Sequence, residues 1–141
     1  MVYPEASLLV SAVSDEVASE AARAWLASPA PSELMTSGSC ETEIVSALAV
    51  RVRRRELSRE ASAATVAVAR DLVRSSTLSI PVIPEHFSAA TELILASSRA
   101  LRAGDALHLA IASSRGAILW TLDRKMAEAG QALGLGTRLL A

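Results

Sequence analysis

The sequence predicts an α/β fold, in which a short parallel sheet is covered by helices on both faces. Short apolar runs alternate with longer helical patterns, and this alternation is typical of parallel sheets. The composition is 51% hydrophobic but only 3% aromatic, so we expect a core of aliphatic side chains and alanine-rich helices. A chain of 141 residues has the usual size of one domain, and we therefore expect a single domain over 1–141.

The first elements follow from short local patterns. Residues 2–3 predict a strand, and the apolar residues of 7–13 predict one or two helical turns. Residues 15–27 carry apolar side chains at helical spacing, and Ser14 before them is a suitable N-cap. Proline and serine in 28–32 predict a loop.

The middle of the chain predicts a brief strand followed by two longer helices. The strand is expected at 33–36. Apolar residues recur every four positions in 40–55, and Ser39 is a suitable N-cap for that helix. A second helix is expected to follow Ser58 and to continue to residue 75.

The last part of the chain again alternates strand and helix. Apolar runs bounded by turn residues predict the strands, and the amphipathic or wholly apolar segments between them predict the helices. In order, the elements are a strand at 78–83, helices at 85–98 and 105–113, a strand at 118–122, a helix at 123–133 and a strand at 137–140.

Composition and charge argue against several classes of protein. No apolar run approaches the ~20 residues that a membrane-spanning helix needs. The first residues contain Glu5 and no basic segment, unlike a secretory signal. Cys40 is the only cysteine, so no disulfide forms within the chain, and we expect a cytoplasmic location. A net charge of −1 argues against a simple polyanion-binding surface.

Arginines nevertheless gather in one segment. Within 51–59 the chain has Arg51, Arg53, Arg54, Arg55 and Arg59. The planar guanidinium group suits phosphate, so this segment is a candidate nucleic-acid contact. The same cluster is also expected at a solvated helix end, where cations complement the helix dipole. The sequence leaves both interpretations open.

Four acidic residues stand out because of their positions. Glu5 and Asp123 each follow a predicted strand. Asp105 opens an otherwise apolar helix, and Glu43 lies on the apolar stripe of the helix at 40–55. Each acid taken alone has an ordinary explanation, as a helix cap or an exposed side chain. Together, in a fold that can bring all four to one edge of the sheet, they predict a site for a hard cation, Mg²⁺ or Mn²⁺. No cysteine or histidine pair has zinc spacing, so zinc is not expected.

At these residues the chain resembles the PIN-domain family, and within it the VapC-like toxins. The resemblance covers nearly the whole chain. The matching segments are Val-Tyr-Pro-Glu-Ala-Ser at 2–7, Glu-Ile-Val-Ser-Ala-Leu at 43–48, Asp-Ala-Leu-His-Leu-Ala at 105–110 and Leu-Trp-Thr-Leu-Asp at 119–123. The segments that begin at Asp105 and end at Asp123 are the most specific of the four.

The resemblance implies a PIN-like three-layer α/β/α sandwich, a homodimer and endonucleolytic cleavage of RNA at a Mg²⁺ or Mn²⁺ site. It also implies a cognate VapB-like antitoxin that covers the site and through which alone the chain reaches operator DNA; no membrane partner is expected. The residues that match the family's catalytic metal-site acids are Glu43, Asp105 and Asp123, with Glu5 as a further metal ligand. The positions that support such a site by hydrogen bonding are Ser7 and Thr121. The expected RNA-backbone contacts are Arg51, Arg53, Arg54, Arg55 and Arg124.

The first segment departs from the family pattern. The family usually has Asp where this chain has Glu5, and an aliphatic residue where it has Pro4. Glutamate is longer by one methylene, and misplaced metal ligands weaken catalysis. The alternative is therefore a catalytically weakened PIN-like binding module that acts through its antitoxin complex. A different Mg²⁺-dependent phosphohydrolase is a third interpretation, although the chain has no phosphate-binding glycine loop. We expect His108 and Cys40 to be structural residues outside the site.

Overall fold

The computed structural model describes residues 1–28 and 34–141. Most of the loop predicted at 28–32 lies outside this part of the chain. In order, the elements are β1 (Val2–Pro4), α1 (Ala6–Val13), α2 (Ser19–Leu26), β2 (Met35–Ser37), α3 (Gly38–Arg53), α4 (Arg59–Ser76), β3 (Leu78–Ile80), α5 (Pro84–Ala96), α6 (Ala103–Ser114), β4 (Ile118–Thr121), α7 (Arg124–Ala132) and β5 (Thr137–Leu139).

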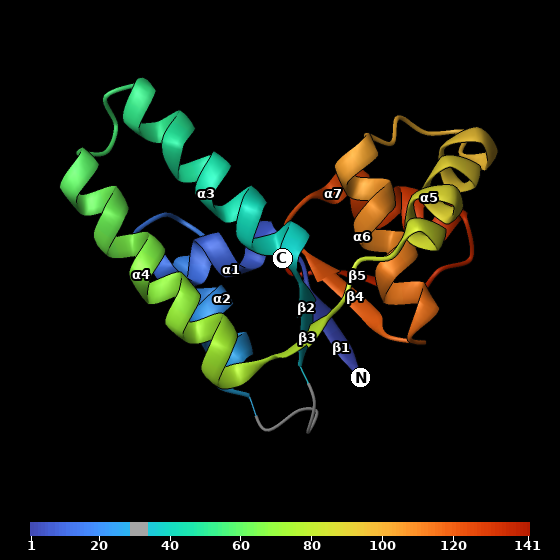
Figure 1. Ribbon diagram of the computed structural model, residues 1–141, viewed down its shortest axis with the longest axis horizontal. Helices are drawn as coiled ribbons and strands as arrows, with labels where there is room; N and C mark the ends of the chain where they lie inside the picture. The colour runs from blue at the N-terminus through green and yellow to red at the C-terminus, as the bar shows by residue number, and fades with distance from the viewer. Residues whose placement is uncertain (29–33) are drawn as a thin grey trace.

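All strand pairs are parallel. Strand β1 pairs with β4 and β4 with β5, while β2 pairs with β3. In the described part of the chain, a single backbone bridge between Val2 and Leu34 joins the two groups of strands. Figure 1 shows helices α1–α4 on one side of the strands and α5–α7 on the other. The predicted α/β fold, a parallel sheet between two helical layers, is confirmed.

The core is built from aliphatic side chains, as the composition predicts. Leu9, Leu48, Leu109, Ile111 and Leu119 are each at most 1% exposed. Leu119 lies in β4, between β1 and β5. Burying one such side chain stabilises the fold by roughly 1.5–3 kcal/mol. Among the helices of the described residues, none has both the length and the apolar character needed to cross a membrane.

Helix α2 begins later than the sequence predicts. It starts at Ser19, and Ser14 does not cap it. Instead, Ser19 Oγ accepts a hydrogen bond from the backbone N of Glu16 and donates one to the backbone O of Ser14, both at 2.9 Å. These bonds form a turn that delays the helix by about one turn.

Helix α3 and strand β3 also differ from their predicted bounds. Helix α3 starts at Gly38, directly after β2, so Ser39 lies inside the helix and does not cap it. Strand β3 ends at Ile80 because the next residue, Pro81, has no amide to continue the ladder. Ser58 caps α4 as predicted.

Candidate metal centre

The carboxyl ends of β1 and β4 meet at one edge of the sheet, and two of the predicted acids follow them. Glu5 comes directly after β1, and Asp123 comes shortly after β4. The two strands are neighbours in the sheet, and the backbone N of Glu5 donates to the backbone O of Trp120 at 2.9 Å. Open α/β sheets place their sites at this edge.

Glu5 is buried and held by two hydroxyl side chains. It is the N-cap of α1, and its Oε1 accepts from the backbone N of Ser7 at 3.1 Å. Its Oε2 accepts from Thr121 Oγ1 at 2.8 Å and also from Ser7 Oγ. A buried carboxylate is costly unless such donors satisfy it. The residues expected to support the site, Ser7 and Thr121, therefore fix the position of this carboxylate.

Glu43 lies on α3 and directs its carboxylate toward α6. Its side chain is 40% exposed, and its Oε1 lies 3.0 Å from Nε2 of His108. A Cβ atom at Gly104 would lie 3.0 Å from the same oxygen. The missing side chain at Gly104 therefore leaves room for the Glu43 carboxylate at the start of α6.

The structure places His108, which the sequence analysis leaves outside the site, directly against Glu43. His108 is 1% exposed, its Nδ1 lies 2.8 Å from Tyr3 Oη, and Tyr3 Oη lies 2.7 Å from Ser37 Oγ. Cys40 Sγ lies 3.5 Å from Tyr3 Oη. Burial alone would lower the pKa of His108, but its hydrogen bonds with Cys40 and Glu43 outweigh burial and raise that pKa to about 10. A line of hydrogen bonds thus runs from β2 through β1 and α6 to the carboxylate on α3.

Arg102 joins the two remaining acids. Asp105, the third residue of α6, accepts with Oδ2 from the backbone N and from Nε of Arg102, both at 3.2 Å. Asp123 caps α7 with Oδ1, which accepts from the backbone N of Lys125 at 2.8 Å, and its Oδ2 lies 3.4 Å from Arg102 Nη2. The hydrogen bond and charge of Asp105, followed by the charges of Asp123 and Glu43, raise the pKa of Arg102 above its ordinary value. The guanidinium group of Arg102 therefore pairs with both Asp105 and Asp123.

The four predicted acids form two neighbouring groups. Ligand atoms of Glu5, Glu43 and His108 lie within 4.8 Å of one another. Among the residues that the structure describes, Asp105 and Asp123 do not join this group and share the arginine instead. Sequence reasoning missed both the arginine and the histidine. A signal for the histidine was present, because a polar side chain on an apolar helix, one turn after Asp105, needs a buried partner.

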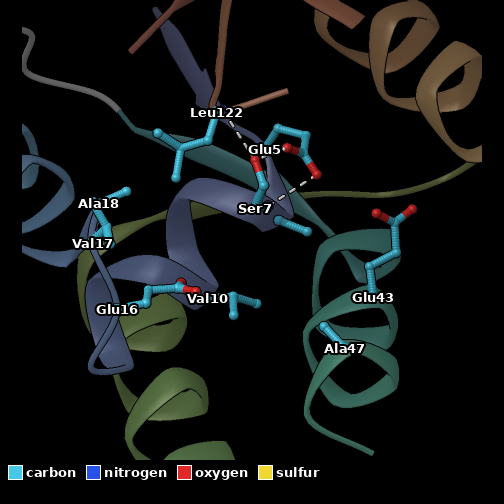
Figure 2. Close-up of a pocket in the computed structure, with 10 residues that line it drawn as sticks. Glu5, Ser7, Val10, Glu16, Val17, Ala18, Glu43, Ala47 and Leu122 are labelled. Atoms are coloured by element: carbon cyan, nitrogen blue, oxygen red, sulfur yellow. Dashed lines mark hydrogen bonds between the residues drawn. The ribbon is translucent and has the colours of Figure 1, made fainter. Parts of the chain in front are cut away.

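A pocket of about 600 Å³ opens beside Glu5 and Glu43. Figure 2 shows these two carboxylates near one end of the pocket and Glu16 near the other. Between them the lining is apolar and consists of Ala6, Val10, Val17, Ala18, Ala47 and Leu122, with Ser7 at the edge. A lining of acidic and apolar side chains suits a ligand that combines positive charge with an apolar part.

The predicted RNA contacts lie in two places. Arg51 and Arg53 are in the last turn of α3, and Arg54 and Arg55 follow it into the exposed connection to α4. At 1.5 Å per helical residue, Arg53 is about 15 Å from Glu43 along α3. Arg124, exposed at the start of α7, is next to Asp123 in the chain. Arg124 is therefore the one predicted contact that adjoins an acid of the site.

Comparison with known proteins identifies the class of this fold and site. The family model for the PIN domain matches residues 2–132, so the chain belongs to the PIN domain family. The match spans all four predicted acids and the two residues that hold Glu5. A sequence search against curated proteins gives no match.

Several solved structures share the fold. VapC20 from Mycobacterium tuberculosis, described as a toxin that cleaves the sarcin-ricin loop, is 19% identical with a TM-score of 0.72, and the match covers 92% of this chain and 95% of VapC20. VapBC2 from Rickettsia felis, bound to a promoter DNA fragment, is 14% identical with a TM-score of 0.68 over 100% of both chains. FitAcB from Neisseria gonorrhoeae is 14% identical with a TM-score of 0.67, over 97% and 96% of the two chains. The expected PIN-like α/β/α sandwich is confirmed.

Proposed function

We propose that the chain is the toxin of a VapBC-type toxin–antitoxin pair and a Mg²⁺- or Mn²⁺-dependent endoribonuclease of the cytoplasm. The observation that carries the proposal is the group formed by Glu5, Glu43 and His108 at the carboxyl edge of the sheet, beside Asp105 and Asp123. Membership of the PIN family and likeness to VapC20, described as a loop-cleaving toxin, support a nuclease.

The donor atoms present fit a hard divalent cation. Glu5 and Glu43 offer carboxylate oxygens, the ligands that suit Mg²⁺ and Mn²⁺, close enough to share one ion. Asp105 and Asp123 can complete the site when the side chain of Arg102 turns away, and that side chain is 80% exposed. When bound, such a cation lowers the pKa of an attacking water and offsets the charge on the phosphate.

The chain's own residues hold the reacting groups and move the proton. Hydrolysis forms a bond from a water oxygen to phosphorus and breaks the bond from phosphorus to a ribose oxygen. The proton of the water passes to a carboxylate, and the departing oxygen takes up a proton from solvent water. Glu43 is the carboxylate that solvent reaches best, with 40% of its side chain exposed against 20% for Asp105 and 33% for Asp123. We therefore assign proton transfer to Glu43.

Arginines position the RNA backbone in this proposal. Arg124 adjoins Asp123, and Arg102 lies among the acids; these positions support a role for both in contacting a phosphate next to the cleaved bond. The cluster at 51–55 lies further along α3 and suits phosphates at a distance from that bond. Contacts of this kind fix the register of the strand and carry no sequence information.

The test of this function is cleavage by the purified chain without its antitoxin. Total cellular RNA is incubated with Mg²⁺, with Mn²⁺ and with EDTA, and the cut ends are mapped. We expect discrete cuts in both metals, none in EDTA, and a loss of cutting in Asp105→Asn. If RNA stays intact in both metals, the chain is not a ribonuclease. Hydrolysis of a small phosphoester alone would favour a different phosphohydrolase.

One observation favours the alternative of a catalytically weakened binding module. The carboxylate of Glu5 already accepts from Ser7 and Thr121 and is only 6% exposed. If these bonds fully engage it, the remaining acids bind a cation more weakly, and the chain acts through its antitoxin complex. In that case intact RNA would be found together with tight antitoxin binding.

We also propose that the antitoxin occupies the pocket beside Glu5 and Glu43. An apolar side chain of the antitoxin fits the apolar lining, and an Arg or Lys of the antitoxin offsets the charge of the carboxylates. The solved complexes of VapBC2 with promoter DNA and of FitAB with a DNA fragment support operator binding through the antitoxin. A complex that leaves both carboxylates open would contradict this placement.

We also propose that the chain forms a homodimer through the exposed apolar side chains of α5. Helix α5 exposes large apolar side chains: Phe87 is 57% exposed, Ile94 39% and Leu95 75%. Exposed apolar side chains that gather on one helix often mark an interface. Light scattering at tens of micromolar protein, on the order of the Kd of a weak dimer, should give the mass of a dimer. A monomer under these conditions would argue against it.

A further inference from the structure

The contact between His108 and Glu43 has the length expected for two ligands of one cation. His108 Nε2 and Glu43 Oε1 are 3.0 Å apart. Two neighbouring ligands of an octahedral ion, each at ~2.1 Å, are also about 3.0 Å apart. A carboxylate oxygen of Glu5 lies within 4.8 Å of both. A cation that lies beside the line between these two atoms can therefore bind both of them once the proton between them is lost.

The second ring nitrogen of His108 is already fixed by a buried partner. Nδ1 lies 2.8 Å from Tyr3 Oη, which lies 2.7 Å from Ser37 Oγ. All three residues are buried. When Nδ1 carries the proton, it donates to Tyr3, Tyr3 donates to Ser37, and Nε2 presents its lone pair to the site. Histidines that bind metals usually have such a partner, which fixes their tautomer and orientation.

We propose that His108 is a direct ligand of the cation, so that one imidazole joins the carboxylates of Glu5 and Glu43 in the site. This inference rests on the proposed function and specifies the ligand set of the same site. Carboxylates suit both Mg²⁺ and Mn²⁺, whereas imidazole suits transition metals and Mg²⁺ prefers oxygen ligands. The site therefore binds Mn²⁺ more tightly than Mg²⁺.

Ligation and simple positioning have different consequences for metal selectivity. If His108 only orients Glu43 through a hydrogen bond, its loss weakens Mg²⁺ and Mn²⁺ binding by the same factor. If His108 is a ligand, its loss removes the one donor that favours Mn²⁺, and the preference for Mn²⁺ disappears. Loss of an outer partner such as the Tyr3 hydroxyl typically weakens metal binding about 10- to 100-fold.

The first experiment detects the ligand directly in the unmodified chain. Electron spin echo modulation is recorded on Mn²⁺ bound to the antitoxin-free protein, grown with either ¹⁴N- or ¹⁵N-histidine. The chain has two histidines. His86 bonds Ser114 Oγ at 3.1 Å, at the end of α6 opposite Asp105, so His86→Gln is the matched control and leaves His108 as the sole histidine. We expect a nitrogen coupling that changes with the histidine label in both proteins.

The second experiment compares the affinities for Mn²⁺ and Mg²⁺ by calorimetry. In the unmodified chain we expect Mn²⁺ to bind at least about tenfold more tightly than Mg²⁺. This ratio corresponds to a difference of about 1.4 kcal/mol in binding free energy. His108→Asn should reduce this ratio toward one, while His86→Gln should leave it unchanged. Because His108 is buried, the fold of His108→Asn is checked first by circular dichroism. If that variant does not fold, the labelling experiment on the unmodified chain and on His86→Gln decides between the two roles of His108.

The nitrogen coupling and the binding of Mn²⁺ together decide whether His108 is a ligand. A label-dependent coupling in His86→Gln supports it. Bound Mn²⁺ without a histidine coupling overturns it, while metal-dependent RNA cleavage by the same sample keeps the proposed function intact. An absence of saturable Mn²⁺ binding overturns both the inference and the proposed function.

Discussion

Thr121→Val tests how firmly the fold holds the Glu5 carboxylate in the metal-free protein. Thr121 Oγ1 donates to Glu5 Oε2 at 2.8 Å and accepts from the backbone N of Asp123 at 3.0 Å, and the residue is fully buried. Valine has the same shape, so the substitution removes hydrogen bonds and keeps the packing. A hydrogen bond to a charged group contributes about 1.5–3 kcal/mol, and the partly buried amide of Asp123, left without a partner, adds about 1 kcal/mol. The expected loss of unfolding free energy is therefore about 2.5–4 kcal/mol.

The matched control is Thr137→Val. Thr137 is also fully buried, but its Oγ1 donates to a neutral acceptor, the backbone O of Ala127, at 3.0 Å. It should cost about 1 kcal/mol. Urea unfolding in EDTA, followed by tryptophan fluorescence, measures both variants, since Trp120 lies next to Thr121 in β4. In thermal unfolding the melting temperature of the Thr121 variant should fall by roughly 8–14 °C. Equal losses for the two variants would refute the argument that Thr121 holds a buried charge.

Burial raises the pKa of Tyr3, the only tyrosine, above its ordinary value of 10.0, so the fold keeps the phenol protonated and loses stability as the pH rises above 10. Ultraviolet absorbance should show tyrosinate only as the chain unfolds; tyrosinate in the folded protein would contradict this. Arg102 competes with the cation for Asp105 and Asp123, and an exposed ion pair contributes about 0.5–1 kcal/mol, so Arg102→Gln should strengthen Mn²⁺ binding about two- to fivefold. Calorimetry showing no gain would mean that Arg102 does not compete with the cation. Glu5→Asp should speed single-turnover RNA cleavage, whereas slower cleavage in both Mg²⁺ and Mn²⁺ would show that Glu5 is fitted to this site.

The parts of the site that depend on local pattern could be predicted from the sequence. The apolar run that ends at Leu122 predicts a strand with Asp123 just beyond it, and the structure has β4 and the cap of α7 at these positions. Glu5 likewise follows β1 as predicted. The strand pattern before Asp123 and its cap of α7 depend on a few neighbouring residues, so they can be predicted from one sequence.

The contacts that complete the site could not be predicted in this way. His108 meets Glu43 across 65 positions and Tyr3 across 105 positions. Helical spacing shows which face of α6 a residue occupies but not which side chain lies opposite. The position of Arg102 is similar, because its ion pair with Asp123 depends on how α6 and α7 are placed on the sheet. The late start of α2 depends on a turn whose hydrogen bonds compete with capping by Ser14.

In the part of the chain that the structure describes, one backbone bridge, between Val2 and Leu34, joins the two groups of strands, and this has an evolutionary consequence. Where a full ladder of amide bonds is lacking, side-chain bonds cross the same boundary: a buried one from Tyr3 to Ser37 and a partly buried one from His108 to Glu43. The groups that orient the candidate centre therefore also join the two halves of the sheet. A lineage that lost the chemistry would still be under selection to keep these side chains for folding, so their presence in a related chain would not by itself show that the chain is active.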